Sequence, residues 1–153
     1  MNNLELKATR QALGLTVLDA SELAGVSKRS FQYWESGKHP IKSDFEQLLF
    51  VMVSHYSMIL RQMIDDLERV TARQFDDDTK PNVVFKPALP FFHSYEDFQA
   101  KTQCEIISYW RIYQAVIGQL LMSGKVNKLD DSADIPSDFK IWRWFAGEHE
   151  YQD

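Results

Sequence analysis

The segment Ser27–Lys38 reads SKRSFQYWESGK and predicts a short helix with two different faces. Phe31 and Trp34 are three residues apart, so on a helix they share one side and can pack against the rest of the protein. The opposite side carries hydrogen-bonding groups, namely Lys28, Arg29, Gln32 and Tyr33. Arg and Lys donate to guanine, Gln pairs with the edge of adenine, and a short helix fits the major groove of B-DNA. The segment therefore predicts a DNA recognition helix.

Turn and capping residues before this segment predict two further helices at close spacing. A first helix over Leu4–Leu13 ends at Gly14, because glycine commonly ends a helix. Thr16 is a favoured N-cap residue and starts a second helix, which ends at the turn made by Gly25. Ser27 caps the third helix in the same way. Three short helices at this spacing predict a compact helix-turn-helix unit.

The first part of the chain resembles the Cro/C1-type helix-turn-helix family, whose fold is lambda repressor-like. The residues that carry the resemblance are Arg10, Gly14-Leu15-Thr16, Gly25-Val26-Ser27 and Trp34-Glu35-Ser36-Gly37-Lys38. The resemblance implies a structural ion pair between Arg10 and Glu35, and groove-facing side chains at Ser27, Lys28, Arg29, Gln32 and Tyr33. It also implies that the backbone at Thr16 and Val17 contacts phosphate from a helix N-terminus. Many members place Gln at position 17, so Val17 leaves only its backbone amide for this contact.

Over most of its length the chain also resembles the YdiL-like family of bacterial and phage regulators, which includes anti-CRISPR-associated transcriptional repressors. The residues that carry this resemblance are Ser30–Lys38, Trp110-Arg111 and Gln114-Ala115-Val116. The resemblance implies an N-terminal DNA-binding domain, a C-terminal dimerisation domain and repression of the operon that encodes the protein. The segment after about Leu129 extends beyond the usual family length, so nothing carries over to it.

Charge is distributed unevenly along the chain. The net charge is −5, but residues 1–42 contain six Lys and Arg against four Asp and Glu, so this part carries +2 and the remainder −7. Phosphate repels an acidic remainder and so favours docking through the basic end. The expected phosphate contacts lie at the start of the predicted recognition helix and just after it, at Ser27, Lys38, His39 and Lys42. So few cations predict modest affinity for each copy and dependence on a dimer.

Sequence patterns divide the chain into two domains of a mainly α fold. The helix-turn-helix domain, residues 1–75, ends with a long amphipathic helix from Ser43 to about Val70. The second half of that helix needs another surface, which is either the C-terminal region or the same helix of a partner. Residues 76–81 contain three aspartates and a proline and predict a linker or loop. Residues 82–153 are expected to form a smaller helical dimerisation domain, in which Val83–Phe85 and Leu89–Phe92 predict a short β ribbon.

A second strongly apolar helix is predicted over Glu105–Met122. Its wide face suits either a domain core or a homodimer seam. The family resemblance and the duplicated half-sites that helix-turn-helix proteins usually bind favour the seam, with Trp110, Tyr113, Ile117 and Leu121 as its residues. Near the end of the chain, Trp142, Trp144 and Phe145 form an aromatic cluster, which either packs on its own protein or anchors another protein or a ligand.

The sequence contains no recognisable catalytic or metal-binding constellation. Its four histidines are scattered, and neither a glycine-rich phosphate loop nor a nucleophile elbow occurs. Cys104 is the single cysteine, which by itself forms neither an internal disulfide nor a zinc site. We therefore expect no enzyme activity, no cofactor and no metal.

The favoured function is a transcriptional regulator that binds double-stranded DNA sequence-specifically as a homodimeric repressor. No apolar run reaches transmembrane length and the N-terminus lacks the order of a secretory signal, which predicts a cytoplasmic protein without a membrane partner. Two alternatives remain, a protein-interaction or antitoxin-like module and an RNA-binding repressor. Salt dependence separates them in part, because nucleic-acid binding falls steeply with salt and a hydrophobic protein interface does not.

Overall fold

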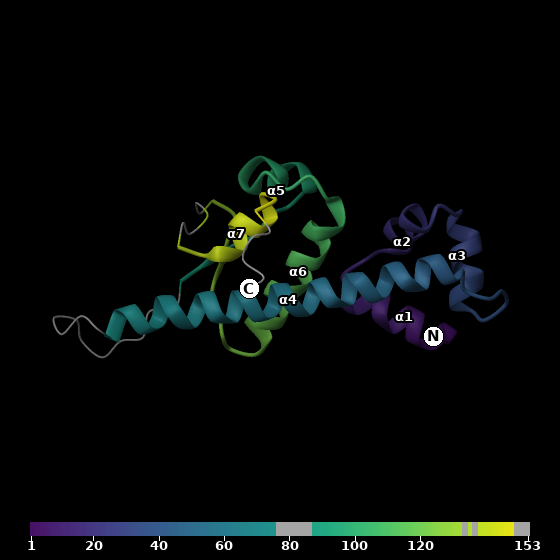
Figure 1. Cartoon of the computed structure of the whole chain (residues 1–153), viewed down its shortest axis with the longest axis horizontal. Coiled ribbons are helices and arrows are strands. Elements are labelled where there is room, and N and C mark those ends of the chain that lie inside the picture. The colour runs from purple at the N-terminus through teal and green to yellow at the C-terminus, as the bar shows by residue number, and fades with distance from the viewer. Residues whose placement is uncertain (76–86, 133–134, 136–137, 149–153) are drawn as a thin grey trace. The chain divides into compact units, whose positions relative to one another are not determined.

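The computed structural model describes residues 1–75, 87–132, 135 and 138–148, apart from the side chains of residues 72–75. Within this part of the chain lie seven helices and one two-stranded sheet (Figure 1), so the predicted mainly α class is confirmed. The elements are α1 (Asn3–Ala12), α2 (Val17–Ala24), α3 (Lys28–Glu35), α4 (Ser43–Phe75), β1 (Leu89–Pro90), α5 (Tyr95–Thr102), α6 (Ile107–Met122), β2 (Leu129–Asp130) and α7 (Lys140–Phe145).

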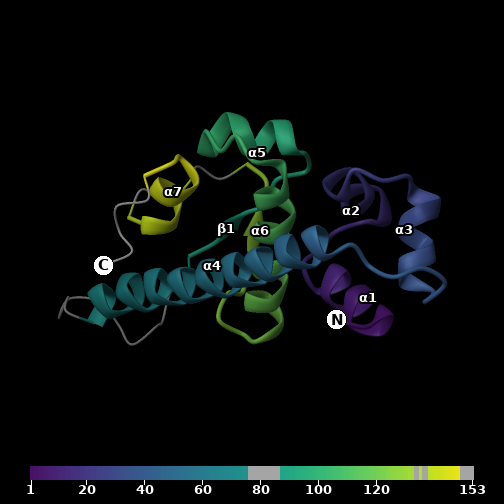
Figure 2. The ribbon, with the colours of Figure 1, turned by 45° about the vertical axis from the view of Figure 1, so that its right-hand side comes forward.

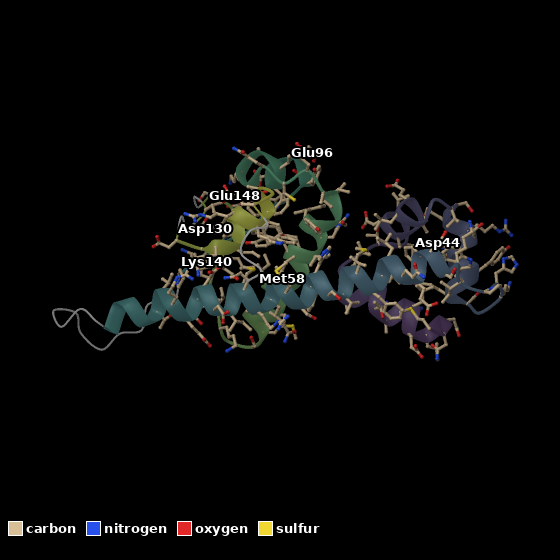
Figure 3. The ribbon with its side chains drawn as sticks, in the orientation of Figure 1. Asp44, Met58, Glu96, Asp130, Lys140 and Glu148 are labelled. Atoms are coloured by element: carbon tan, nitrogen blue, oxygen red, sulfur yellow. The ribbon has the colours of Figure 1, made fainter. Side chains whose placement is uncertain are left out.

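The chain packs as two compact units, unit 1 over Met1–Ser57 and unit 2 over Met58–Asp153. Helix α4 runs through both, and Figure 3 marks Asp44 near its start and Met58 at the first residue of unit 2. The division therefore falls inside a helix, whereas the sequence-based division assigned residues 1–75 to the first domain. The predicted linker, residues 76–81, and the predicted extended segment Val83–Phe85 lie outside the described residues. Of the helices in the described ranges, none combines the length and apolar content needed to cross a membrane.

Capping side chains determine where the helices of unit 1 begin. The Thr16 hydroxyl accepts a hydrogen bond from the Asp19 amide at 3.0 Å, and the Asp19 carboxylate accepts one from the Thr16 amide at 2.8 Å. Ser27 caps α3 by accepting a hydrogen bond from the Ser30 amide at 3.1 Å. Gly25 has a φ of +68°, which side chains with a Cβ adopt at a cost, and it turns the chain between α2 and α3. These features are consistent with the helix-turn-helix arrangement that the sequence predicts.

Aromatic packing closes unit 1 against the buried side of α3. The rings of Phe31 and Trp34 lie 5.6 Å from each other, and they lie 5.5 and 5.8 Å from the Phe45 ring on α4, measured between centroids. All three side chains are buried. The α-amino group of Met1 donates to the Glu46 carboxylate, which raises the pKa of that amino group above its ordinary value. The first turns of α4 therefore hold both α3 and the start of the chain.

Unit 2 is built around an aromatic core that α5, α6 and α7 share. Figure 2 shows the ribbons of these three helices. The Phe98 ring of α5 lies 5.8 Å from the Tyr113 ring of α6 and 5.2 Å from the Phe145 ring of α7. Phe92, which follows β1, lies 5.2 Å from Phe98 and 5.4 Å from Tyr113. Buried aromatic pairs contribute about 0.5–1.5 kcal/mol beyond the burial of their area.

The short sheet and the start of α6 hold the segment around β1 in place. Strand β1 pairs in parallel with β2, with Leu89 opposite Leu129, so the partner of the predicted Leu89–Phe92 segment comes from much later in the chain. The Trp110 indole donates to the Phe92 carbonyl at 3.0 Å, and the Tyr113 hydroxyl donates to the Pro90 carbonyl at 2.6 Å. Burial raises the pKa of Tyr113 well above its ordinary value, which keeps this donor protonated.

Helix α7 belongs to the core of unit 2. Trp142, Trp144 and Phe145 of α7 are buried, and their rings contact Tyr109 and Tyr113 of α6. The aromatic cluster therefore packs on its own chain. Its residues are not exposed anchors for another protein, because aromatic neighbours within unit 2 already cover them.

A buried carboxylate fixes the start of α7. Asp66 of α4 is 0% exposed, and its Oδ2 accepts a hydrogen bond from the Ile141 amide at 3.1 Å. Its Oδ1 accepts from Gln62 and from Arg69, each at 3.0 Å, and Arg69 also donates to the Asp138 carbonyl. Amides in the first turn of a helix lack acceptors within the helix, so an acidic side chain at this place satisfies one of them and suits the helix dipole.

We expect Asp66→Ala to lower the free energy of unfolding by about 2–4 kcal/mol, because it leaves the Ile141 amide and Arg69 without their buried acceptor. The matched control is Asp65→Ala, which removes an exposed neighbouring carboxylate and is expected to change stability by less than about 0.5 kcal/mol. Urea unfolding followed by tryptophan fluorescence measures both variants. Equal losses in the two variants would contradict the role assigned to Asp66.

Candidate nucleic-acid interface

A buried ion pair joins α1 to α3. Arg10 Nε lies 2.7 Å from Glu35 Oε2, Arg10 Nη2 lies 3.1 Å from Glu35 Oε1, and the two side chains are 10% and 9% exposed. Arg10 Nη1 donates to the Leu15 carbonyl at 2.9 Å. The ion pair implied by the Cro/C1 resemblance is therefore present. Its bidentate geometry makes both residues part of the scaffold.

Helix α3 has the two faces that its sequence predicts. Phe31 and Trp34 are buried, whereas Lys28, Arg29 and Gln32 are exposed. Capping by Ser27 and the glycine turn before it set the start of the helix, and the aromatic contacts with α4 set its rotation. The exposed donors of α3 are thus presented on one side of unit 1.

Tyr33 lies half-buried at the centre of a cluster on this exposed side, the Tyr33 cluster, formed by Arg29, Tyr33, Lys38 and His39. Arg29 Nε donates to the Tyr33 hydroxyl at 2.8 Å. Lys38 Nζ lies 5.2 Å from the centroid of the Tyr33 ring, and the His39 ring lies 5.0 Å from it, edge to face. The sequence predicts a groove-facing Tyr33 but not its place at the centre of this cluster. The four-residue spacing from Arg29 to Tyr33 was the signal available for the contact between them.

Two of the groups predicted to contact phosphate, the Thr16 amide and the Ser27 hydroxyl, already form hydrogen bonds within the chain. The Thr16 amide donates to Asp19, whose carboxylate would also repel a phosphate at this place, so the capping box competes with the predicted backbone contact of Thr16. Val17, the first residue of α2, is left as the candidate amide. The Ser27 hydroxyl donates to the Ser30 hydroxyl at 3.0 Å while capping α3, so its hydrogen is engaged as well. Capping chemistry, which uses the same groups as anion binding, explains both differences.

The remaining predicted contacts lie on the surface. Lys38, His39 and Lys42 are exposed and follow α3 directly along the chain. Arg10 is the one basic residue of the first 42 residues that is buried, and Glu35 neutralises it. The other cations of this part remain available to solvent or to an anionic partner.

The predicted dimer seam is contradicted at two of its four residues. Tyr113 and Ile117 are buried in the core of unit 2, and Tyr113 contacts the Pro90 carbonyl and the Trp142 ring of α7. Trp110 is half-buried and bonded to the Phe92 carbonyl, whereas Leu121 is 41% exposed. An apolar helix face suits a core and a seam equally well. Most of the apolar face of α6 is buried in the core of unit 2.

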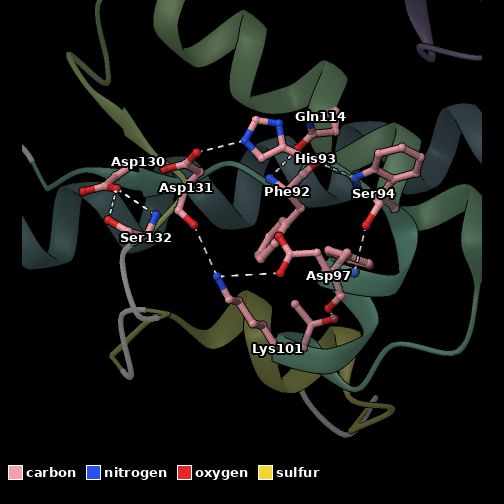
Figure 4. Close-up of polar contacts among 12 residues, drawn as sticks. Phe92, His93, Ser94, Asp97, Lys101, Gln114, Asp130, Asp131 and Ser132 are labelled. Atoms are coloured by element: carbon pink, nitrogen blue, oxygen red, sulfur yellow. Dashed lines mark hydrogen bonds and ion pairs between the residues drawn. The ribbon is translucent and has the colours of Figure 1, made fainter.

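Unit 2 also carries an open depression, which is lined by Phe91, His93, Lys128, Leu129, Asp130 and Asp131. Two of its polar groups bond each other, and Figure 4 marks this contact between His93 and Asp131. His93 Nε2 lies 2.9 Å from Asp131 Oδ2, and the two side chains are 67% and 62% exposed. Exposed pairs of this kind contribute about 0–1 kcal/mol. Among the residues with described positions, no three His, Cys, Asp or Glu side chains gather as metal ligands would. The depression therefore defines a site less well than α3 does.

These features support a helix-turn-helix-like class of protein, in which the third helix is exposed and polar. The chain matches the sequence profile of the family described as Aca2/YdiL-like over residues 1–129. It is 32% identical over 117 residues to the Aca2 repressor of Pectobacterium phage ZF40, an alignment that covers 76% of this chain and 89% of the relative. The chain therefore belongs to the Aca2/YdiL-like family. The match ends at β2, so α7 and its aromatic cluster lie beyond it.

We expect Arg10→Ala to lower the free energy of unfolding by about 3–5 kcal/mol, because Glu35 and the Leu15 carbonyl lose their buried partner. Lys7→Ala, an exposed substitution on the same helix, is the control and is expected to cost less than about 0.5 kcal/mol. Guanidinium unfolding followed by circular dichroism measures both. A cost for Arg10→Ala no larger than the control would show that the ion pair does not hold α3.

Proposed function

We propose that this protein is a sequence-specific DNA-binding transcriptional repressor that inserts α3 into the major groove. The observation that carries the proposal is the two-faced α3, whose apolar side is buried while Lys28, Arg29 and Gln32 are exposed together. These are the side-chain types that read guanine and adenine edges. Membership of a family that contains a protein named as a repressor supports the same function.

In the proposed mechanism, Lys28, Arg29 and Gln32 read base edges and the residues that follow α3 hold phosphates. Lys38, His39 and Lys42 fill this second role, since they are exposed beside the helix. Phosphate contacts fix the register of a protein on the duplex, and base contacts specify the sequence. Occupancy of a promoter in the operon that encodes the protein would then exclude RNA polymerase.

We further propose that the repressor acts in the cytoplasm as a homodimer on an inverted repeat. Helix-turn-helix proteins commonly bind two half-sites related by the symmetry of the dimer. The small number of exposed cations in unit 1 supports this, because few phosphate contacts give one copy little affinity. Leu121 is the exposed member of the predicted seam, and Met122 beside it is 86% exposed.

The two alternatives have less support. A protein-interaction module would need exposed anchors, but Trp142, Trp144 and Phe145 are buried. An RNA-binding repressor could stack Tyr33 on an unpaired base, but Lys38 and His39 already contact that ring.

A selection from two pools of double-stranded DNA tests the proposal, one pool randomised and one taken from upstream of the gene. The full-length protein is used at two salt concentrations. We expect enrichment of an inverted repeat and a steep loss of binding as salt rises, because bound cations displace counterions from phosphate. Enrichment of no sequence at low salt, by protein that is folded, would overturn the proposal. An equal affinity for single-stranded RNA of the same sequence would favour the RNA alternative.

We expect Arg29→Ala to cost about 1–3 kcal/mol of binding free energy at one base pair of the half-site and to relax specificity there. Lys38→Ala is expected to weaken binding to all sequences alike and to reduce the slope of log K against log salt by about 1. Fluorescence anisotropy with a set of single-base-pair variants of the selected site measures both effects. A uniform loss across every variant site for Arg29→Ala would contradict its role as a base contact.

A further inference from the structure

The Tyr33 cluster constrains which atoms of Arg29 can reach DNA. A guanidinium offers two edges to a guanine, one formed by Nε and a terminal nitrogen and one formed by the two terminal nitrogens. The Tyr33 hydroxyl accepts the hydrogen bond from Nε at 2.8 Å, so the first edge is already occupied. The edge formed by Nη1 and Nη2 remains, and its two parallel donors match the O6 and N7 acceptors of guanine in the major groove.

We infer that Tyr33 is a positioning residue for recognition, whose hydroxyl orients Arg29 so that its two terminal nitrogens contact one guanine end-on. The inference rests on the proposed function and deepens it, because it assigns the base and the mode of contact. It gives the groove-facing Tyr33 a positioning role in place of a direct contact with a base. The chemical partner is a G·C base pair in each half-site.

Two properties of the pair support this role. Arg29 and Tyr33 are four residues apart on α3, which places their side chains next to each other on one face. An exposed arginine loses much rotational freedom when it binds, and a contact made in the free protein removes part of that loss beforehand. The Arg29 guanidinium carbon also lies 5.6 Å from the centroid of the Tyr33 ring, so the contact uses both the hydroxyl and the ring.

The ring and the hydroxyl of Tyr33 contact different residues, so their roles can be tested separately. Lys38 and His39 contact the ring, at 5.2 and 5.0 Å from its centroid, and belong to the predicted phosphate contacts. The hydroxyl bonds Arg29 alone among the contacts found in the described residues. Removing only the hydroxyl should therefore disturb base discrimination and leave the phosphate contacts in place.

The test compares Tyr33→Phe, Arg29→Ala and the double variant with the wild-type protein on the DNA site selected from the randomised pool. Each binds the selected site and its single-base-pair variants. The base pair at which Arg29→Ala loses discrimination identifies the contact of Arg29. Tyr56→Phe, at a half-buried tyrosine of α4, is the matched control, and thermal melting by circular dichroism verifies that each variant is folded.

We expect Tyr33→Phe to reduce discrimination at the Arg29 base pair by about fivefold, the contribution of one ordinary hydrogen bond. Affinity for unrelated DNA is expected to stay within about twofold of the wild type, because the phosphate contacts remain. In the Arg29→Ala background, Tyr33→Phe is expected to have no further effect, since its partner is absent. The base preferred at that position by the wild-type protein is expected to be guanine.

Two results would overturn the inference while leaving the proposed function intact. One is an additive loss in the double variant at a second base pair, which would make Tyr33 a base contact in its own right. The other is a uniform loss on all DNA for Tyr33→Phe, which would make its role purely structural. Failure of the wild-type protein to select any DNA sequence would overturn the proposed function and this inference together.

Discussion

Arg10 is a buried cation, and a guanidinium is tolerated inside a small protein only when its donors find acceptors. Here Glu35 takes two of them and the Leu15 carbonyl takes a third. These contacts join α1, the turn before α2 and the end of α3. Helix α3 has only eight residues, too few to be stable alone in water. Its position therefore depends on this ion pair and on the packing of Phe31 and Trp34, and the direction of every exposed donor follows from that position.

In unit 2, too, buried polar side chains form hydrogen bonds that hold elements together. Asp66 accepts a hydrogen bond from an amide in the first turn of α7. Trp110 and Tyr113 donate hydrogen bonds to carbonyl groups near β1. Gln114 Oε1 lies 3.5 Å from the Phe92 amide, at the long limit of such a contact. Trp110 and Gln114 are among the residues that carry the YdiL-like resemblance. Their contacts with Phe92 explain this part of the resemblance, because they help to hold the fold of unit 2.

Local chemistry made much of unit 1 predictable from the sequence. Thr16, Gly25 and Ser27 act through neighbours within a few residues, so their caps and turn could be assigned from spacing alone. The burial of Phe31 and Trp34 followed from their shared helix face. The phosphate contact predicted for the Thr16 amide competes with the capping box, in which the same amide donates to the nearby Asp19.

Unit 2 was less predictable because its decisive contacts are distant in sequence. Tyr113 and Ile117 lie on an apolar face that the sequence could not assign to a core or to a seam. Both are buried in the core of unit 2, where the Trp142 ring, about thirty positions later in the chain, lies next to Tyr113. Asp65 and Asp66 look alike in the sequence, yet only Asp66 is buried, and it accepts a hydrogen bond from the Ile141 amide. The partner of Leu89 is Leu129, a pairing that no local pattern marks.

Methylation interference on the selected DNA site tests most directly whether α3 reads the major groove. Dimethyl sulfate methylates guanine at N7, in the major groove, and adenine at N3, in the minor groove. We expect N7 methylation of one guanine in each half-site to block binding by the wild-type protein and to be tolerated by Arg29→Ala. Interference confined to adenine N3, with every guanine N7 indifferent to methylation, would contradict it.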